Sequence, residues 1–192
     1  MMPRGLYQVI YGWRYPTVRD CGDAVLTDVG PGAAGDRYVA DFGYLAFGAE
    51  TETTFKLCAL PREWMALGLD VGLPGKDRLD VEVNQFKEGT LHDVKVAVSL
   101  ADQNGRTVLT HEGALGESWV WSYGSALNSA FVYNQYTMFI PRRGQTYELR
   151  VSVVPADRST DARARLVVNG GGWKAASPPS DGDVETVRDL IK

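Results

Sequence analysis

Residues 94–111 read VKVAVSLADQNGRTVLTH, and this stretch decides the fold class. Hydrophobic residues occupy every second position as far as Leu100, which places them on one face of an extended strand. The Asn104-Gly105 pair that follows readily adopts the positive φ angles of a tight turn. The stretch therefore predicts a β-hairpin whose second strand covers residues 107–111.

The same alternation recurs along the chain, between segments rich in Gly, Pro, Asp or Asn that suit turns. Further strand candidates are residues 5–11, 24–29, 37–47, 52–59, 79–83, 117–123, 130–140, 147–153 and 162–166. So many strands with so little helix between them favour two packed antiparallel sheets over βαβ units. We therefore expect an all-β fold, a two-sheet antiparallel β-sandwich of the jelly-roll or immunoglobulin-like kind.

The chain length of 192 residues suits one domain with a sizeable core. We expect the β-sandwich domain to cover residues 1–174, with one or two helical turns over 61–67 because proline suits a first helical position. Residues 175–182 are rich in Pro and Ser and predict an extended linker. A short C-terminal helix is expected over 183–192, with Asp183 as its N-cap.

The charge balance is 20 basic against 24 acidic residues, a net charge of −4, and no run of Lys or Arg marks a surface for nucleic acid. We therefore expect no nucleic-acid partner. No stretch approaches the roughly 18 consecutive apolar residues of a membrane helix, so we expect a soluble protein without a transmembrane segment. The first residues lack the pattern of a secretory signal, which predicts a cytoplasmic protein or a periplasmic one whose signal segment has been removed.

The two cysteines, Cys21 and Cys58, allow at most one internal disulfide and do not have a metal-ligand spacing. Unpaired cysteine is among the most often buried residue types, so we expect two buried free thiols. A disulfide between them would instead favour an exported protein.

Catalytic motifs are sparse in this sequence. The two histidines, His92 and His111, do not form a zincin pattern, and neither a G-x-S-x-G elbow nor a P-loop occurs. Residues 30–35 match G-x-G-x-x-G, but a strand-like segment follows them where a dinucleotide site needs a helix. We therefore predict no catalytic residues, no metal, no cofactor and no enzymatic activity.

Aromatic residues are unusually dense between residues 119 and 139. The candidate binding residues in this region are Trp119, Trp121, Tyr123, Tyr133, Asn134 and Tyr136. A period of two places the first three aromatic residues on one side of the predicted strand 117–123, beside the next strand. Two interpretations follow: aromatic packing in the sandwich core, or an exposed platform for a ligand.

Three short segments carry a resemblance to a known group of proteins: Thr54–Leu57, Phe139–Pro141 and Gly144–Val151. Their pattern resembles that of small bacterial β-sandwich domains of unknown function in envelope proteins and lipoproteins, some of them suspected immunity proteins against secreted toxins. The resemblance covers residues 40–170 and implies a β-sandwich and a protein partner. The chain departs from this group at its start, where no signal or lipidated cysteine is found, and no functional residue is carried over.

Three functions are consistent with these observations. The first is a non-catalytic protein-binding β-sandwich, an immunity or accessory protein, whose acidic balance suits a basic partner. The second is a carbohydrate-binding module in which the aromatic residues stack on sugar rings of a glycan. The third is a carboxylate-dependent hydrolase, which needs two carboxylates facing each other across a cleft.

Overall fold

The structure is a computed structural model of the chain. It describes residues 22–32, 35–58, 60, 64–71, 89, 91–119, 121–124, 130–142, 144–157, 161–170 and 186. The strands are β1 (Val25–Gly32), β2 (Gly35–Ala46), β3 (Thr51–Cys58), β4 (Met65–Val71), β5 (Lys95–Asp102), β6 (Thr107–Ala114), β7 (Trp121–Gly124), β8 (Ala130–Phe139), β9 (Thr146–Val154) and β10 (Arg163–Gly170). One helical turn, α3 (Leu115–Ser118), follows β6.

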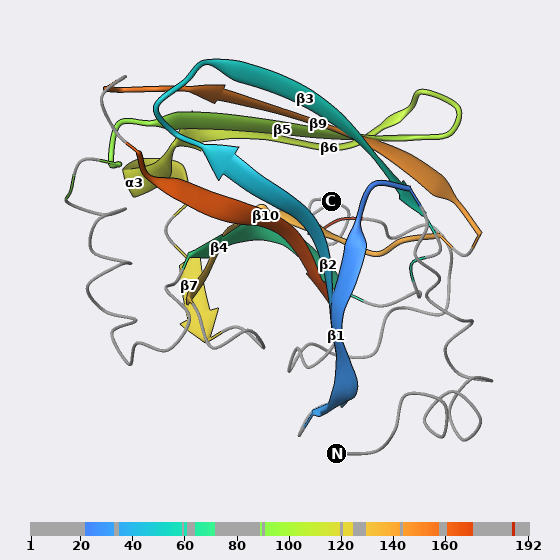
Figure 1. The fold of residues 1–192 in the computed structure, drawn as a ribbon. Helices are drawn as coiled ribbons and strands as arrows, with labels where there is room; N and C mark the ends of the chain where they lie inside the picture. Colours follow the sequence, from blue (N-terminus) through green and yellow to red (C-terminus); the bar gives the residue numbers. More distant parts are fainter. Residues whose placement is uncertain are drawn as a thin grey trace.

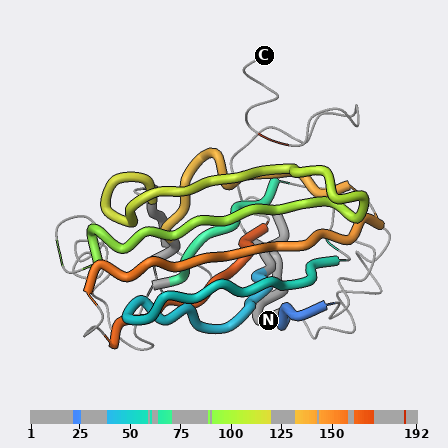
Figure 2. Tube along the Cα trace, turned by 90° about the horizontal axis from the view of Figure 1, so that it is seen from above, coloured from blue at the N-terminus to red at the C-terminus, as the bar shows by residue number. Residues whose placement is uncertain are grey.

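The strands form two packed sheets, which confirms the predicted antiparallel β-sandwich (Figure 1). A six-stranded sheet has the order β1-β2-β10-β4-β8-β7, and a four-stranded sheet has the order β3-β9-β5-β6. Every strand pairing in both sheets is antiparallel. Figure 2 looks onto the four-stranded sheet, whose strands lie side by side.

The pairing pattern identifies the sandwich as a jelly roll. β5 pairs with β6, β4 with β8, β3 with β9 and β2 with β10, so the pairs are nested around the β5–β6 hairpin. Such nesting makes one long two-stranded ribbon, which is rolled up so that successive pairs alternate between the two sheets. Of the two sandwich types expected from the sequence, the jelly roll is the one observed.

The core lies between the sheets and is built by the predicted alternation. On β5, Val96, Val98 and Leu100 are at most 3% exposed, while the residues between them are half-buried. Leu149 and Val151 on β9 point into the same core. Burial of each such side chain contributes about 1.5–3 kcal/mol, so this alternation is the main reason why the hairpin region takes up a strand conformation.

The β5–β6 turn is held by the carboxylate of Asp102. Its Oδ1 accepts hydrogen bonds from the backbone N–H groups of Asn104 (2.9 Å) and Arg106 (3.0 Å), and its Oδ2 from the Arg106 side chain (3.0 Å). Gly105 has a φ of +79°, as the Asn-Gly pair predicted. Partial desolvation raises the pKa of Asp102, but these hydrogen bonds and the Arg106 charge outweigh it and lower the pKa below its ordinary value of 3.8.

Because the folded pKa of Asp102 lies below the unfolded one, its ionised form stabilises the fold. This stabilisation is complete above the ordinary pKa of 3.8 and is lost as the pH falls through the lower folded pKa. We therefore expect Asp102→Asn to be less stable than the wild type at pH 7, with a difference that shrinks in acid. Urea denaturation at pH 7 and pH 3 measures this, with the exposed Asp161→Asn as a control. A difference that is independent of pH would contradict it.

Two local predictions were wrong. Helical turns were expected over 61–67, but Met65 to Leu67 belong to β4. This strand lies inside the six-stranded sheet and is buried on both faces. Its large apolar residues, Met65, Leu67 and Leu69, alternate with Ala66, Gly68 and Asp70, a period of two that the helical prediction did not use. The strand expected over 117–123 begins only at Trp121, because α3 precedes it and is anchored by a hydrogen bond from Leu115 N to Val94 O (2.8 Å).

The expectation of two free thiols was also wrong. Cys58 is buried, but it is disulfide-bonded. The sequence contains only one other cysteine, Cys21, which directly precedes Gly22. Gly22 forms a β-bridge with Leu57, the residue before Cys58, so the two cysteines adjoin a pair of bridged residues. A disulfide between Cys58 and Cys21 fits this pairing of their sequence neighbours at the end of β3.

Several sequence-based predictions lie outside the described residues. These are the strands over 5–11 and 79–83 and the linker over 175–182. Of the C-terminal helix expected over 183–192, only Thr186 is described, and it forms an isolated antiparallel bridge with Phe139. No helix in the described part of the chain has the length and apolar character needed to cross a membrane.

Candidate functional site

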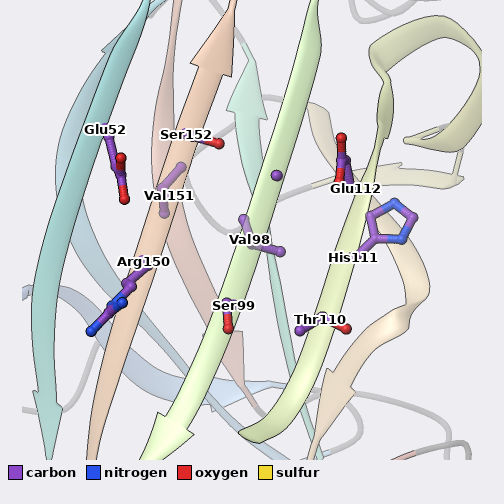
Figure 3. A pocket seen from close by; sticks show the side chains of 10 residues that line it. Glu52, Val98, Ser99, Thr110, His111, Glu112, Arg150, Val151 and Ser152 are labelled. Atoms are coloured by element: carbon purple, nitrogen blue, oxygen red, sulfur yellow. The ribbon is translucent and has the colours of Figure 1, made fainter.

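A shallow groove of about 510 Å³ lies on the outer face of the four-stranded sheet (Figure 3). Its residues come from matched rows across the four strands. One row contains Glu52, Ser152, Ala97 and Glu112, and the next contains Arg150, Ser99 and Thr110. Because alternate residues of each strand face outward, the strands that bury the core with one half of their residues build this groove with the other half.

The floor of the groove is made of small residues. Ala97 and Ser99 of β5 lie in its middle beside Ser152 of β9, and they leave the space that longer side chains would fill. Glu52 on β3 and Glu112 on β6 stand at opposite sides (Figure 3). Two strands separate them, so their backbones are about 14 Å apart at the usual spacing between strands.

The charges around the groove are only partly neutralised. Arg150 forms an ion pair of 2.8 Å with Glu148, and Lys56 lies opposite Glu148 on β3. The side chains of Glu52 and Glu112 form no hydrogen bond or ion pair with the residues that the structure describes. Two carboxylates therefore remain available to a ligand in this groove.

His111 connects the edge of the groove to the core. Its ring lies 4.8 Å from that of Trp119 in an edge-on arrangement, and its Nε2 is 3.2 Å from the carbonyl oxygen of Ser118. The same carbonyl accepts a hydrogen bond of 2.6 Å from Asn134 Nδ2. These contacts hold α3 against β6 and β8, so His111 has a structural role here.

Two of the aromatic residues predicted as a binding platform, Trp119 and Tyr133, are buried. Trp119 is 1% exposed and belongs to the main core, and Tyr133 is buried in a smaller cluster with Val39, Ala66 and Val167. Burial raises the pKa of the Tyr133 phenol. For Trp119, the core interpretation left open by the sequence is therefore confirmed, because a buried indole cannot stack on a sugar.

The remaining predicted residues lie on β7 and β8. Trp121 and Tyr123 are paired in register with Tyr133 and Phe131, so the expected neighbouring strands are present. Tyr136 is exposed.

Both ends of the Asn134 side-chain amide are used inside the fold. Its Oδ1 accepts a hydrogen bond of 2.9 Å from Tyr136 N, while its Nδ2 donates to the Ser118 carbonyl as described above. This residue therefore has a structural role in the β8 irregularity between Tyr133 and Met138.

Sequence reasoning missed the groove, because alternation shows which residues of a strand face outward but not which strands become neighbours. The polar residues that alternate with the core residues on β5 and β9 are the ones that line it. In the described residues, no group of three or more His, Cys, Asp or Glu side chains is placed to hold a metal ion. In the glycine motif over 30–35, Gly32 ends β1 and is paired with Gly35, the first residue of β2.

Comparison with known proteins gives no further identification. No model of a known protein family matches the chain, and no curated protein is significantly similar to it.

Proposed function

We propose that this chain is a non-catalytic protein-binding β-sandwich whose groove on the four-stranded sheet receives a basic segment of its partner. The observation that carries this proposal is the pair of carboxylates, Glu52 and Glu112, without ion-pair partners among the described residues, on either side of a floor of small residues. A lysine or arginine side chain fits such a floor and complements these charges.

The spacing of the carboxylates favours binding over hydrolysis. Glycosidases hold their two carboxyl groups roughly 5–10 Å apart. Side chains of a sheet stand roughly perpendicular to it, so Glu52 and Glu112 keep a separation close to that of their strands, about 14 Å.

The disulfide at Cys58 supports an exported location for this binding protein. Disulfides form and persist in oxidising compartments and are rare in the cytosol. A role as an immunity or accessory protein of the bacterial envelope, suggested by the resemblance of its strand sequences, is consistent with that location.

To test the proposal, the purified chain is incubated with peptide libraries in which one position is fixed as Lys, Arg, Gln or Glu, and the bound peptides are identified. We expect the wild type to prefer Lys or Arg at low salt. The double variant Glu52→Gln/Glu112→Gln should weaken binding of the selected peptide by about threefold to tenfold, since each exposed ion pair contributes about 0.2–1 kcal/mol.

Glu117→Gln is the matched control, because it removes the same charge from α3, outside the groove lining. It should bind as the wild type does. Selection of neutral or acidic peptides, or equal loss in the control, would overturn the proposal. Binding to a glycan panel that survives the double substitution would favour a carbohydrate-binding module instead.

A further inference from the structure

A second surface lies on the other sheet, where β2 and β10 are paired. Tyr44 of β2 is 57% exposed, which is unusual for a large aromatic side chain on a sheet. The guanidinium carbons of Arg163 and Arg165 lie 4.6 and 5.8 Å from the centre of its ring. We call these three residues the Tyr44 patch.

A β-bulge builds this patch. Arg165 pairs with Tyr44 and Val167 pairs with Asp41, so β2 contains one residue more than β10 between these two pairs. Gly43 adopts a φ of +90° in the bulge and donates its backbone N–H to Asp41 Oδ1 at 2.8 Å. A bulge of this kind changes the direction of a neighbouring side chain, and here that side chain is Tyr44.

The two arginines of the patch differ in their charge partners. Arg165 forms an ion pair with the buried carboxylate of Asp41 and lies opposite Asp70 on β4. Arg163 forms no ion pair with any residue that the structure describes, including Asp161 two positions earlier. Arg165 is therefore fixed by the fold, whereas the positive charge of Arg163 is not neutralised.

We propose that the Tyr44 patch binds a carboxylate side chain of a protein partner. When a guanidinium group stacks on an aromatic ring, its N–H groups point outward in the guanidinium plane. Two of them can then donate hydrogen bonds to the two oxygens of one carboxylate. Tyrosine and arginine are the residue types that most often dominate the energy of protein interfaces. This surface is separate from the groove and has the opposite charge preference, so it does not depend on the function proposed above.

The test uses ¹⁵N-labelled protein and peptides carrying paired glutamates, titrated while the NMR signal of the Arg163 side-chain Nε is followed. Peptides with glutamine in place of glutamate are the negative probe. We expect the glutamate peptides to shift the Arg163 signal, and Arg163→Gln to weaken their binding about fivefold to tenfold. Arg163→Lys should recover only part of it, because an ammonium group lacks the planar fork.

Arg150→Gln is the matched control, since it removes an exposed arginine from the other sheet. It should leave the binding of glutamate peptides unchanged, as should Glu52→Gln/Glu112→Gln. The proposal is overturned if glutamine peptides shift the Arg163 signal equally, or if Arg163→Gln binds like the wild type. A stronger response to inorganic phosphate than to glutamate peptides would also overturn it, by assigning the patch to phosphate groups.

Discussion

Replacing Trp119 by alanine is expected to lower the free energy of unfolding by about 3–5 kcal/mol. The indole is 1% exposed within the main core, and its backbone N–H donates to Leu115 O at 3.3 Å, where α3 ends. Its removal leaves a cavity beside His111 and loses the contact of 4.8 Å between the two rings. Denaturation by urea, followed by circular dichroism, measures the loss.

The variant Trp119→Phe tests how much of this loss is due to the apolar volume of the indole. Among the residues that the structure describes, the buried indole Nε1 has no hydrogen-bond partner. A buried donor without a partner has a desolvation cost, so phenylalanine removes this cost while it keeps most of the apolar volume. We expect a loss below about 1.5 kcal/mol for this variant. A change of less than about 0.5 kcal/mol for Trp119→Ala would instead place the indole at the surface and restore the platform interpretation.

Breaking the disulfide of Cys58 is expected to cost about 4 kcal/mol, from the entropy of the chain that it closes between residues 21 and 58. Neighbouring contacts already hold this part of the chain on β3: Asp23 N donates to Lys56 O at 3.0 Å, and Lys56 N donates to Asp23 Oδ2 at 2.7 Å. Because these contacts remain, the reduced protein should still fold, with lower stability.

The measurement compares unfolding with and without reductant, and Cys58→Ser with the wild type. The double variant Cys21→Ser/Cys58→Ser is the control, and reductant should not change its stability. Two thiols that titrate in the native protein under oxidising conditions would contradict the prediction. They would also remove the main support for an exported protein.

The strands that could be predicted from the sequence are those whose two faces differ in polarity. β5 and β9 each have one face in the core and one in solvent, so polarity alternates along them. β4 also has a period of two, since Met65, Leu67 and Leu69 alternate with small or polar residues, but the helical prediction rested on the proline at position 61 and did not use it. The place of β4 between β8 and β10 depends on long-range pairing.

The candidate site was less predictable than the fold, for a related reason. The density of aromatic residues drew attention to Trp119 and Tyr133, but composition does not distinguish a core cluster from a platform. The groove depends on which outward residues become neighbours across four strands, such as Glu52 and Ser152. The Tyr44 patch depends on a bulge at Gly43 that shifts the register by one residue. No local pattern in the sequence contains that information.

The nested strand order has a consequence for how the chain is made. β9 lies between β3 and β5, and β10 lies between β2 and β4, so the last two of the described strands fill inner positions in both sheets. Until the ribosome has released them, four earlier strands have unpaired edges, and such edges attract other chains. The β5–β6 hairpin can form early, since its contacts are local, but the sandwich closes only after β9 and β10 have been synthesised. Until then, a nascent chain of this protein stays open and in need of protection.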